Sequence, residues 1–148
     1  PGIGHLLLLL ERCGATNVRV IQRDAAEVLP QLLPSASFAA VNLFFPDPWP
    51  KKRHHKRRLV QDDFVEAAVR VLTPGGGWLV QSDHEEYFTQ IRDLLGRRPE
   101  LTEVPWDDPA AETDPDWRGT NYEIKYARDG RAIHRAAYLK GTDLDSVV

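Results

Sequence analysis

The chain has 148 residues, of which 42% are apolar, and a formal net charge of -3. This length and apolar content suit one ordinary globular domain, 1–148, and exclude an intrinsically disordered protein. The charge is unevenly distributed, because six of the 19 lysines and arginines fall within residues 51–58 while the 22 acidic residues all lie elsewhere. Such a concentration predicts contact with a polyanion at one place.

The first part of the chain predicts alternating helices and strands. Residues 5–13 are expected to form a buried helix that ends at Gly14, and residues 17–24 a strand. Residues 25–33 then predict a short helix. Residues 37–45 form an apolar run with little alternation, which is typical of a strand covered on both faces.

The alternation continues beyond the basic run. Residues 62–72 predict a helix with an aspartate cap that stops at Pro-Gly-Gly-Gly, followed by a strand at 78–83 and a helix at 85–96. The tail is less regular: the sequence is compatible with a strand at 101–106, a loop at 107–119, an ambiguous segment at 120–130 and a strand at 132–140. The order of elements predicts the α/β class with a parallel sheet.

Three aspartates come at or just past the carboxyl ends of predicted strands: Asp24, Asp47 and Asp83. Ligands of open α/β sheets bind outside these strand ends. Asp24 and Asp83 each have a simpler explanation as the cap of the next helix, but three aspartates at one edge favour a binding site.

Asp47 lies in the most unusual stretch, with prolines at 46, 48 and 50. These prolines favour extended backbone, so that Asp47 and Trp49 can project to a similar side. A carboxylate beside an indole suits a flat heterocycle such as a nucleic-acid base, although Trp49 has the alternative of a core aromatic. The basic run has its own alternatives, a solvated loop or a nuclear-import patch, whereas its position beside the pocket favours nucleic-acid phosphates.

The segment FFPDPWPKKRHHKRRLV closely resembles the signature of the bacterial tRNA (guanine-N7)-methyltransferases, and three further motifs match in order. RDAAEVL is similar to the adenosine-side segment of that family, SDH stands where the family usually has Thr-Asp-Trp, and TNYE matches Thr-x-x-Glu. The resemblance implies a Rossmann-like, class I S-adenosylmethionine-dependent methyltransferase, with a mostly parallel sheet and helices on both faces.

The family's functional residues carry over as expectations. Asp24 would contact the donor S-adenosylmethionine, and Asp47 would line both the donor and guanine sites as the catalytic residue. The tRNA would be bound by Lys51, Asp83, Thr120, Asn121, Tyr122 and Glu123. His84 departs from the usual tryptophan, which puts a stacking role at that position in question.

A second departure is that the glycine-rich donor loop and the first strands of the family would precede Pro1. The resemblance therefore implies that residues 1–148 are the C-terminal part of the domain, and that this part alone would be inactive. Because the strands that separate 17–23 from 38–45 in the family would be missing, we expect no backbone ladder between these two segments, and a gap of about two strand widths.

The chemistry implied is methyl transfer to N7 of a variable-loop guanosine. N7 carries a free lone pair and needs no general base, so the site must mainly position it and meet positive charge with carboxylates. Two alternatives remain: an amino-group methyltransferase of the N6-adenine type, since Asp47-Pro48-Trp49 resembles its motif, and a noncatalytic RNA-binding subunit.

We expect a monomer or homodimer in the cytoplasm, with tRNA as its partner, no membrane contact and no metal. The single cysteine, Cys13, agrees with a reducing compartment.

Overall fold

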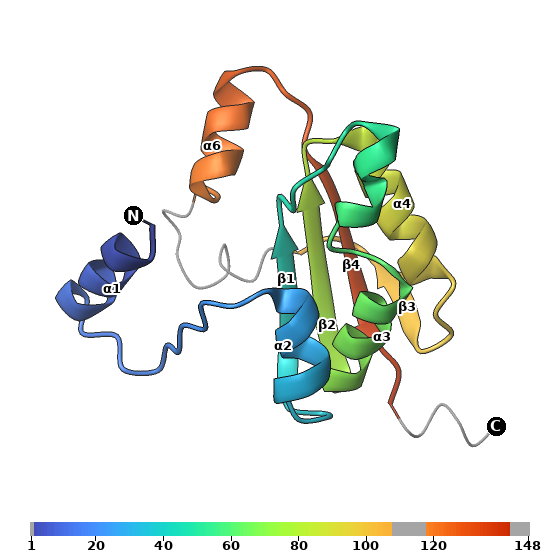
Figure 1. Cartoon of the computed structure of the whole chain (residues 1–148), viewed down its shortest axis with the longest axis horizontal. Helices are drawn as coiled ribbons and strands as arrows, with labels where there is room; N and C mark the ends of the chain where they lie inside the picture. Colours follow the sequence, from blue (N-terminus) through green and yellow to red (C-terminus); the bar gives the residue numbers. More distant parts are fainter. Residues whose placement is uncertain (1, 108–117, 143–148) are drawn as a thin grey trace.

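The computed structural model of the chain (Figure 1) describes residues 2–107 and 118–142. Helices and strands alternate through most of it, which confirms the α/β class. In chain order they are α1 (Gly2–Arg12), α2 (Ala25–Leu32), β1 (Phe38–Phe44), the 3-10 helix η1 (Lys52–Arg57), α3 (Asp62–Val71), β2 (Leu72–Ser82), α4 (Glu85–Gly96), β3 (Leu101–Val104), α6 (Asn121–Arg128) and β4 (His134–Lys140).

The four strands form one sheet in the order β1-β2-β4-β3. β1 and β2 are parallel, because α3 carries the chain back to the same end of the sheet between them. β4 inserts between β2 and β3 and is antiparallel to both. The sheet of the described residues is therefore mixed rather than mostly parallel, since its C-terminal strand returns in the opposite direction.

The core lies on one face of this sheet. Trp78 and Val80 of β2 stand opposite Tyr138 and Ala136 of β4, and the alternation of side chains puts all four on the same face. Each is at most 3% exposed. Helices α3 and α4 bury their apolar sides on this face, and α2 adds Ala25 and Leu29 at its margin, whereas the expectation placed helices on both faces.

Helices α3 and α4 form where the apolar spacing predicts them, but their caps differ from expectation. Gln61 is the N-cap of α3 and makes no side-chain capping bond, so the predicted aspartate cap is wrong. His84 caps α4, and its Nδ1 accepts a hydrogen bond from the Tyr87 N–H at 3.3 Å. The burial of one face, more than the caps, therefore holds these helices.

The N-terminal segment differs most from expectation. Residues 17–23 form no strand, and Val18, Val20 and Ile21 are 41%, 37% and 54% exposed. A strand needs a partner for its backbone groups, and β1 pairs only with β2 among the described residues, so the expected absence of a ladder from 17–23 to β1 is confirmed. Helix α1 does form, but it is not buried: its leucines 6–9 are 40–53% exposed.

Strands β1 and β2 also differ from their predicted environments. β1 is exposed over most of its length rather than covered on both faces. β2 begins at Leu72 and carries Pro-Gly-Gly-Gly within it, with a register shift opposite Phe38 and Ala40. A Cβ at Gly76 would lie 2.8 Å from the Thr73 carbonyl oxygen, so only glycine allows this close approach.

The tail is more regular than predicted. The ambiguous segment 120–130 holds helix α6, and the strands predicted at 101–106 and 132–140 appear as β3 and β4. The predicted loop 107–119 lies largely outside the described residues. Within those residues, every helix is too short or too polar to cross a bilayer.

Candidate functional site

The loop that follows β1 has an unusual backbone around Asp47. Phe45 and Trp49, two residues to either side, have φ angles of 52° and 41°, a left-handed conformation that side chains with a Cβ rarely adopt. The Phe45 N–H donates to the Gln81 carbonyl oxygen at 2.8 Å and fixes the start of the loop on β2. Left-handed residues held in this way occur preferentially at functional sites.

Asp47 and Asp24 line the same cavity, as predicted, although Asp24 begins α2 and follows no strand in the structure. The cavity has a volume of about 570 Å³, which is within the range of small-molecule sites. Its remaining lining combines apolar groups of α2 and β1 with polar and basic groups that follow β1: Ala25, Ala26, Leu43, Pro46, Lys56, Arg57, Arg58, Leu59, Gln61 and Asp63.

Asp24 also caps a helix. Its Oδ1 accepts a hydrogen bond from the Ala26 N–H at 2.9 Å, which makes it the N-cap of α2. The capping explanation and the binding-site explanation therefore apply to the same carboxylate, because the start of α2 forms part of the cavity wall.

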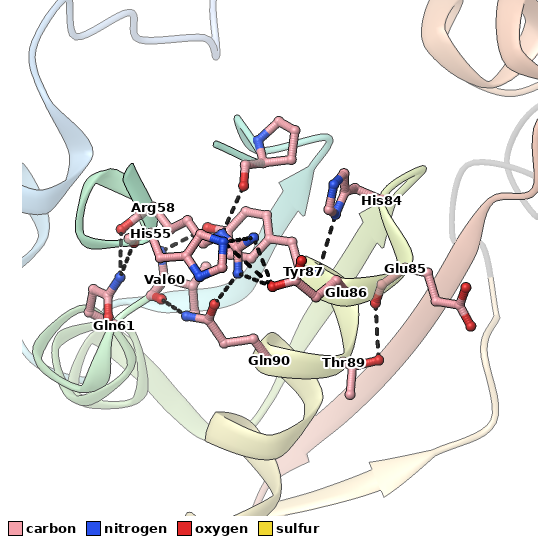
Figure 2. Close-up of polar contacts among 11 residues, drawn as sticks. His55, Arg58, Val60, Gln61, His84, Glu85, Glu86, Tyr87, Thr89 and Gln90 are labelled. Atoms are coloured by element: carbon pink, nitrogen blue, oxygen red, sulfur yellow. Dashed lines mark hydrogen bonds and ion pairs between the residues drawn. The ribbon is translucent and has the colours of Figure 1, made fainter. Parts of the chain in front are cut away.

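Asp83 lies at the end of β2, as predicted, but does not line this cavity. Its Oδ2 accepts a hydrogen bond from Arg131 Nη1 at 3.0 Å, and its side chain is 19% exposed. The neighbouring His84 points into the first turn of α4, where it caps the helix (Figure 2). In this structure His84 has a capping role that a tryptophan could not fill in the same way.

The basic run is largely exposed, in agreement with a contact surface. Lys51, Lys52, Arg53, Lys56 and Arg57 are exposed on or beside η1. The Arg57 guanidinium lies over the Trp49 ring, 5.0 Å from its centroid, and His54 meets the same ring edge-on at 5.8 Å. Trp49 is half-buried and is held between these groups rather than in the core.

The last residue of the run, Arg58, is buried, which its sequence context did not predict. It is 3% exposed and lies between η1 and α4, where His55, Glu86 and Gln90 converge on it (Figure 2). Beneath it lies Tyr87, whose hydroxyl accepts a hydrogen bond from the Val60 N–H at 3.0 Å. Burial raises the pKa of the Tyr87 phenol, so the ring stays neutral beneath the guanidinium.

The Thr-x-x-Glu motif forms a capping box at the start of α6. The Glu123 N–H donates to Thr120 Oγ1 at 3.2 Å, and the Thr120 N–H donates to Glu123 Oε2 at 2.6 Å. Arg135 Nη2 donates to Glu123 Oε1 at 2.9 Å. Burial of Glu123 opposes its ionisation, but the hydrogen bonds from Thr120 and Arg135 outweigh it and hold the pKa of this carboxyl below its usual value.

Gly119 permits this arrangement. Its φ is +96°, and a Cβ there would lie 3.1 Å from Glu123 Oε2. Because of both facts, any residue larger than glycine would be strained at this position. The motif is therefore a four-part structure in which Gly119, Thr120, Glu123 and Arg135 fix one another.

Aromatic contacts join α6 to the loop after β1. The Phe45 ring lies 5.5 Å from Tyr122 and 5.4 Å from Tyr126, measured between centroids. Tyr122 is 55% exposed and Asn121 is also exposed. Of the predicted substrate residues, Tyr122 thus contacts the Asp47 loop, Lys51 is exposed to solvent, and Asp83 is paired with Arg131. The described residues contain no group of three or more histidine, cysteine or acidic side chains that could hold a metal ion.

Comparison with known proteins places the chain among methyltransferases. Residues 1–136 match the model of the family described as "Putative methyltransferase". The tRNA (guanine-N(7)-)-methyltransferase of Nitrosococcus oceani is 38% identical over 143 residues, which is 97% of this chain and 59% of that protein. The proteins of the same name from Alkalilimnicola ehrlichii and Nitrosospira multiformis are 44% and 49% identical, over 88% and 69% of this chain and 53% and 44% of their own lengths.

The chain spans about half the length of the curated relatives it matches. Among solved structures, a SAM-dependent O-methyltransferase from Thermotoga maritima superimposes with a TM-score of 0.52 and 15% identity, over 90% of this chain and 43% of that chain. The [4+2]-cyclase SpnF gives a TM-score of 0.50 and 14% identity, over 90% of this chain and 60% of that chain. At these identities the structural similarity establishes the fold alone.

Proposed function

The chain belongs to this methyltransferase family, and we propose that its whole protein transfers a methyl group from S-adenosylmethionine to N7 of the variable-loop guanosine of tRNA. The observation that carries the proposal is the pairing of Asp24 and Asp47 in one cavity, beside the exposed basic run. The names of the relatives, which are tRNA (guanine-N(7)-)-methyltransferases, support the choice of substrate.

Two carboxylates of the cavity suit the positive charge of the donor, while Lys56, Arg57 and Arg58 line the same cavity. When bound, S-adenosylmethionine supplies an electrophilic methyl group on a sulfonium cation. Asp24 and Asp47 place two carboxylates on a cavity of about 570 Å³ that is otherwise partly apolar through Leu43 and Pro46. Both carboxylates are exposed in this structure, and in the proposal they face the sulfonium and stabilise its charge by their orientation.

Asp47 acts in this proposal through charge and placement rather than proton transfer. Guanine N7 is a hydrogen-bond acceptor with a free lone pair, so no proton needs to leave before the methyl group arrives. Positive charge moves onto the purine during the transfer, and a carboxylate held beside it stabilises that charge. The loop after β1, fixed at Phe45, sets the position of Asp47.

The remaining predicted residues divide the binding of tRNA between them. Lys51 and its exposed neighbours contact phosphates, which supply most of the affinity of basic surfaces for nucleic acids. Asn121 and Tyr122, exposed on α6, contact the target nucleoside, while Thr120 and Glu123 support that contact by fixing the start of α6 through their capping box. Asp83 contributes through Arg131, which it holds in place. In this proposal the protein acts on tRNA in the cytoplasm, as a monomer or homodimer.

The donor site is completed, in this proposal, by residues of the whole protein that lie outside the chain. β1 has no partner on its outer edge among residues 2–107 and 118–142, and the valines and isoleucine of 17–23 are exposed. Further strands and a glycine-rich loop would pair with this edge and approach the donor closely. The 148 residues alone are then inactive.

The test is nucleoside analysis by mass spectrometry after the full-length protein has acted on unmodified tRNA with S-adenosylmethionine. We expect N7-methylguanosine, and we expect Asp47→Asn to lower turnover by about a hundredfold or more while leaving the thermal unfolding midpoint unchanged. N6-methyladenosine as the product would establish the amino-group alternative instead. Tight tRNA binding without any methylated nucleoside would establish a noncatalytic RNA-binding protein.

A further inference from the structure

Arg58 differs from the rest of the basic run in its burial. Five of the six basic residues of the run are exposed, whereas the Arg58 side chain is only 1% exposed. A phosphate of a nucleic acid cannot reach a guanidinium that is enclosed in this way. Arg58 therefore needs a role other than binding the polyanion.

Its contacts point back to the loop that carries Asp47. Arg58 Nε donates a hydrogen bond to the Pro48 carbonyl oxygen at 2.8 Å. The opposite end of the guanidinium is held by α4, through Gln90 Oε1 at 2.5 Å from Nη1 and Glu86 Oε1 at 3.3 Å from Nη2. Arg58 thus connects the residue that follows Asp47 to a helix of the core.

The loop has few backbone N–H groups that could hold it in place. Pro46, Pro48 and Pro50 have no N–H, so the backbone around Asp47 is held mainly through its carbonyls. The Phe45 N–H bond to Gln81 fixes the segment before Asp47, and the Arg58 bond to Pro48 fixes it after Asp47. The left-handed conformations of Phe45 and Trp49 cost energy and persist only where such contacts hold them.

We propose that Arg58 is a positioning residue for methyl transfer: it fixes the Pro48 carbonyl and thereby the place of the Asp47 carboxylate at the cavity. The inference rests on the proposed function. A planar guanidinium reaches Pro48, Gln90 and Glu86 at once while its face lies 4.8 Å from the centroid of the Tyr87 ring. A lysine ammonium is a point charge and cannot reproduce this arrangement.

The experiment compares Arg58→Lys with wild type in the full-length protein, measuring kcat and KM for tRNA methylation and the salt dependence of tRNA binding. We expect kcat to fall about tenfold or more, with KM and the salt slope within twofold of wild type, because the charge remains while the loop loses its anchor. Arg98→Lys is the matched control, since Arg98 Nη2 also donates to a backbone carbonyl, that of Asp62 at 2.8 Å, away from Asp47. Its kcat should stay at the wild-type value.

A second variant separates positioning from folding. Arg58→Ala leaves a space that ethylguanidinium can fill, and we expect millimolar ethylguanidinium, but not ethylammonium, to restore part of kcat. Turnover of Arg58→Lys equal to wild type, a change in KM alone, or a fall in kcat that matches the decrease in folded protein measured by circular dichroism would each overturn the inference. If wild type forms no N7-methylguanosine, the proposed function fails and the inference fails with it.

Discussion

Two regions rich in apolar residues differ in how far they bury them. The N-terminal arm, residues 2–33, buries one residue, Val28, at 7% exposure. The packed block, residues 60–104 and 134–140, holds the whole of the remaining core, including Trp78, Tyr87 and Leu95 at 0%. Apolar residues gain stability only where a second surface removes them from water, and the arm finds such a surface only at α2.

The cavity lies at the boundary between these regions. Asp24 and Ala25 come from the arm, while Leu59 and Gln61 lead into the packed block. One wall is therefore anchored to a core and the other to a weakly packed segment. The comparison predicts that stability and methyl transfer respond to different substitutions, and the following changes test where the boundary falls.

The largest effect is expected from one leucine in each region. Leu95→Ala in α4 removes a fully buried side chain and should lower the free energy of unfolding by about 2–5 kcal/mol. Leu8→Ala in α1, where the side chain is 53% exposed, should change it by less than about 0.5 kcal/mol. Urea unfolding followed by circular dichroism measures both, and equal decreases would show that the arm is packed as firmly as the block.

The next change asks to which region α6 belongs. Gly119→Ala forces a Cβ against Glu123 in a left-handed backbone and should cost about 1–3 kcal/mol. Gly96→Ala is the control, because a Cβ there meets nothing within 4 Å. A destabilisation confined to Gly119→Ala in thermal unfolding would place α6 with the packed block, and two equal midpoints would place it with the arm.

A third change tests the exposed residues of the boundary. Replacing both Lys52 and Arg53 by alanine in the full-length protein should flatten the dependence of tRNA affinity on salt, by about 0.7–0.9 log units for each phosphate that the variant no longer binds. Arg58→Lys, which keeps its charge out of solvent, should leave that slope unchanged. Fluorescence titration at several salt concentrations gives the slopes. An unaltered slope for the double variant would show that the basic run is a solvated loop that binds no phosphate.

The smallest expected effect is on the stability of the protein at acidic pH. The folded state lowers the pKa of Glu123, so its contribution to stability is complete above the ordinary value of 4.5 and is lost as pH falls through the lower, folded-state pKa. Thermal midpoints between pH 6 and pH 3 should therefore fall more steeply for wild type than for Glu123→Gln. Parallel pH profiles of the two proteins would contradict the lowered pKa.

Local patterns predicted most of the packed block. The spacing of Tyr87, Phe88, Ile91 and Leu95 marks α4, whose predicted bounds match those observed, because one helical face meets the core along its whole length. The same reasoning fails at 17–23, where valine and isoleucine favour a strand but no partner strand is present beside them among the described residues. Strand formation depends on a neighbour that the local sequence does not contain.

The candidate site was predictable in position but not in its supports. Asp24 and Asp47 line one cavity as predicted, but only Asp47 follows a strand, because Asp24 begins α2. Asp83 pairs with Arg131 instead, since a strand-end position fixes an edge and not the direction of a side chain. Arg58 could not be distinguished by composition from the five exposed basic residues before it. Its one local signal is the apolar pair Leu59 and Val60 that follows and leads the chain into the core.

The insertion of β4 between β2 and β3 sets an order of assembly. β3 has no partner other than β4 among the described residues, so residues 101–104 cannot join the sheet until residues 134–140 have left the ribosome. Lys140 at the end of β4 then joins this strand to the end of α3 and the start of β2, because its Nζ donates to the carbonyl oxygens of Val69 and Leu72 at 2.8 Å each. Such distant pairings slow folding. During synthesis the nascent chain therefore carries the edge of β2 unpaired from residue 82 until residues 134–140 emerge, an interval in which that edge is open to aggregation.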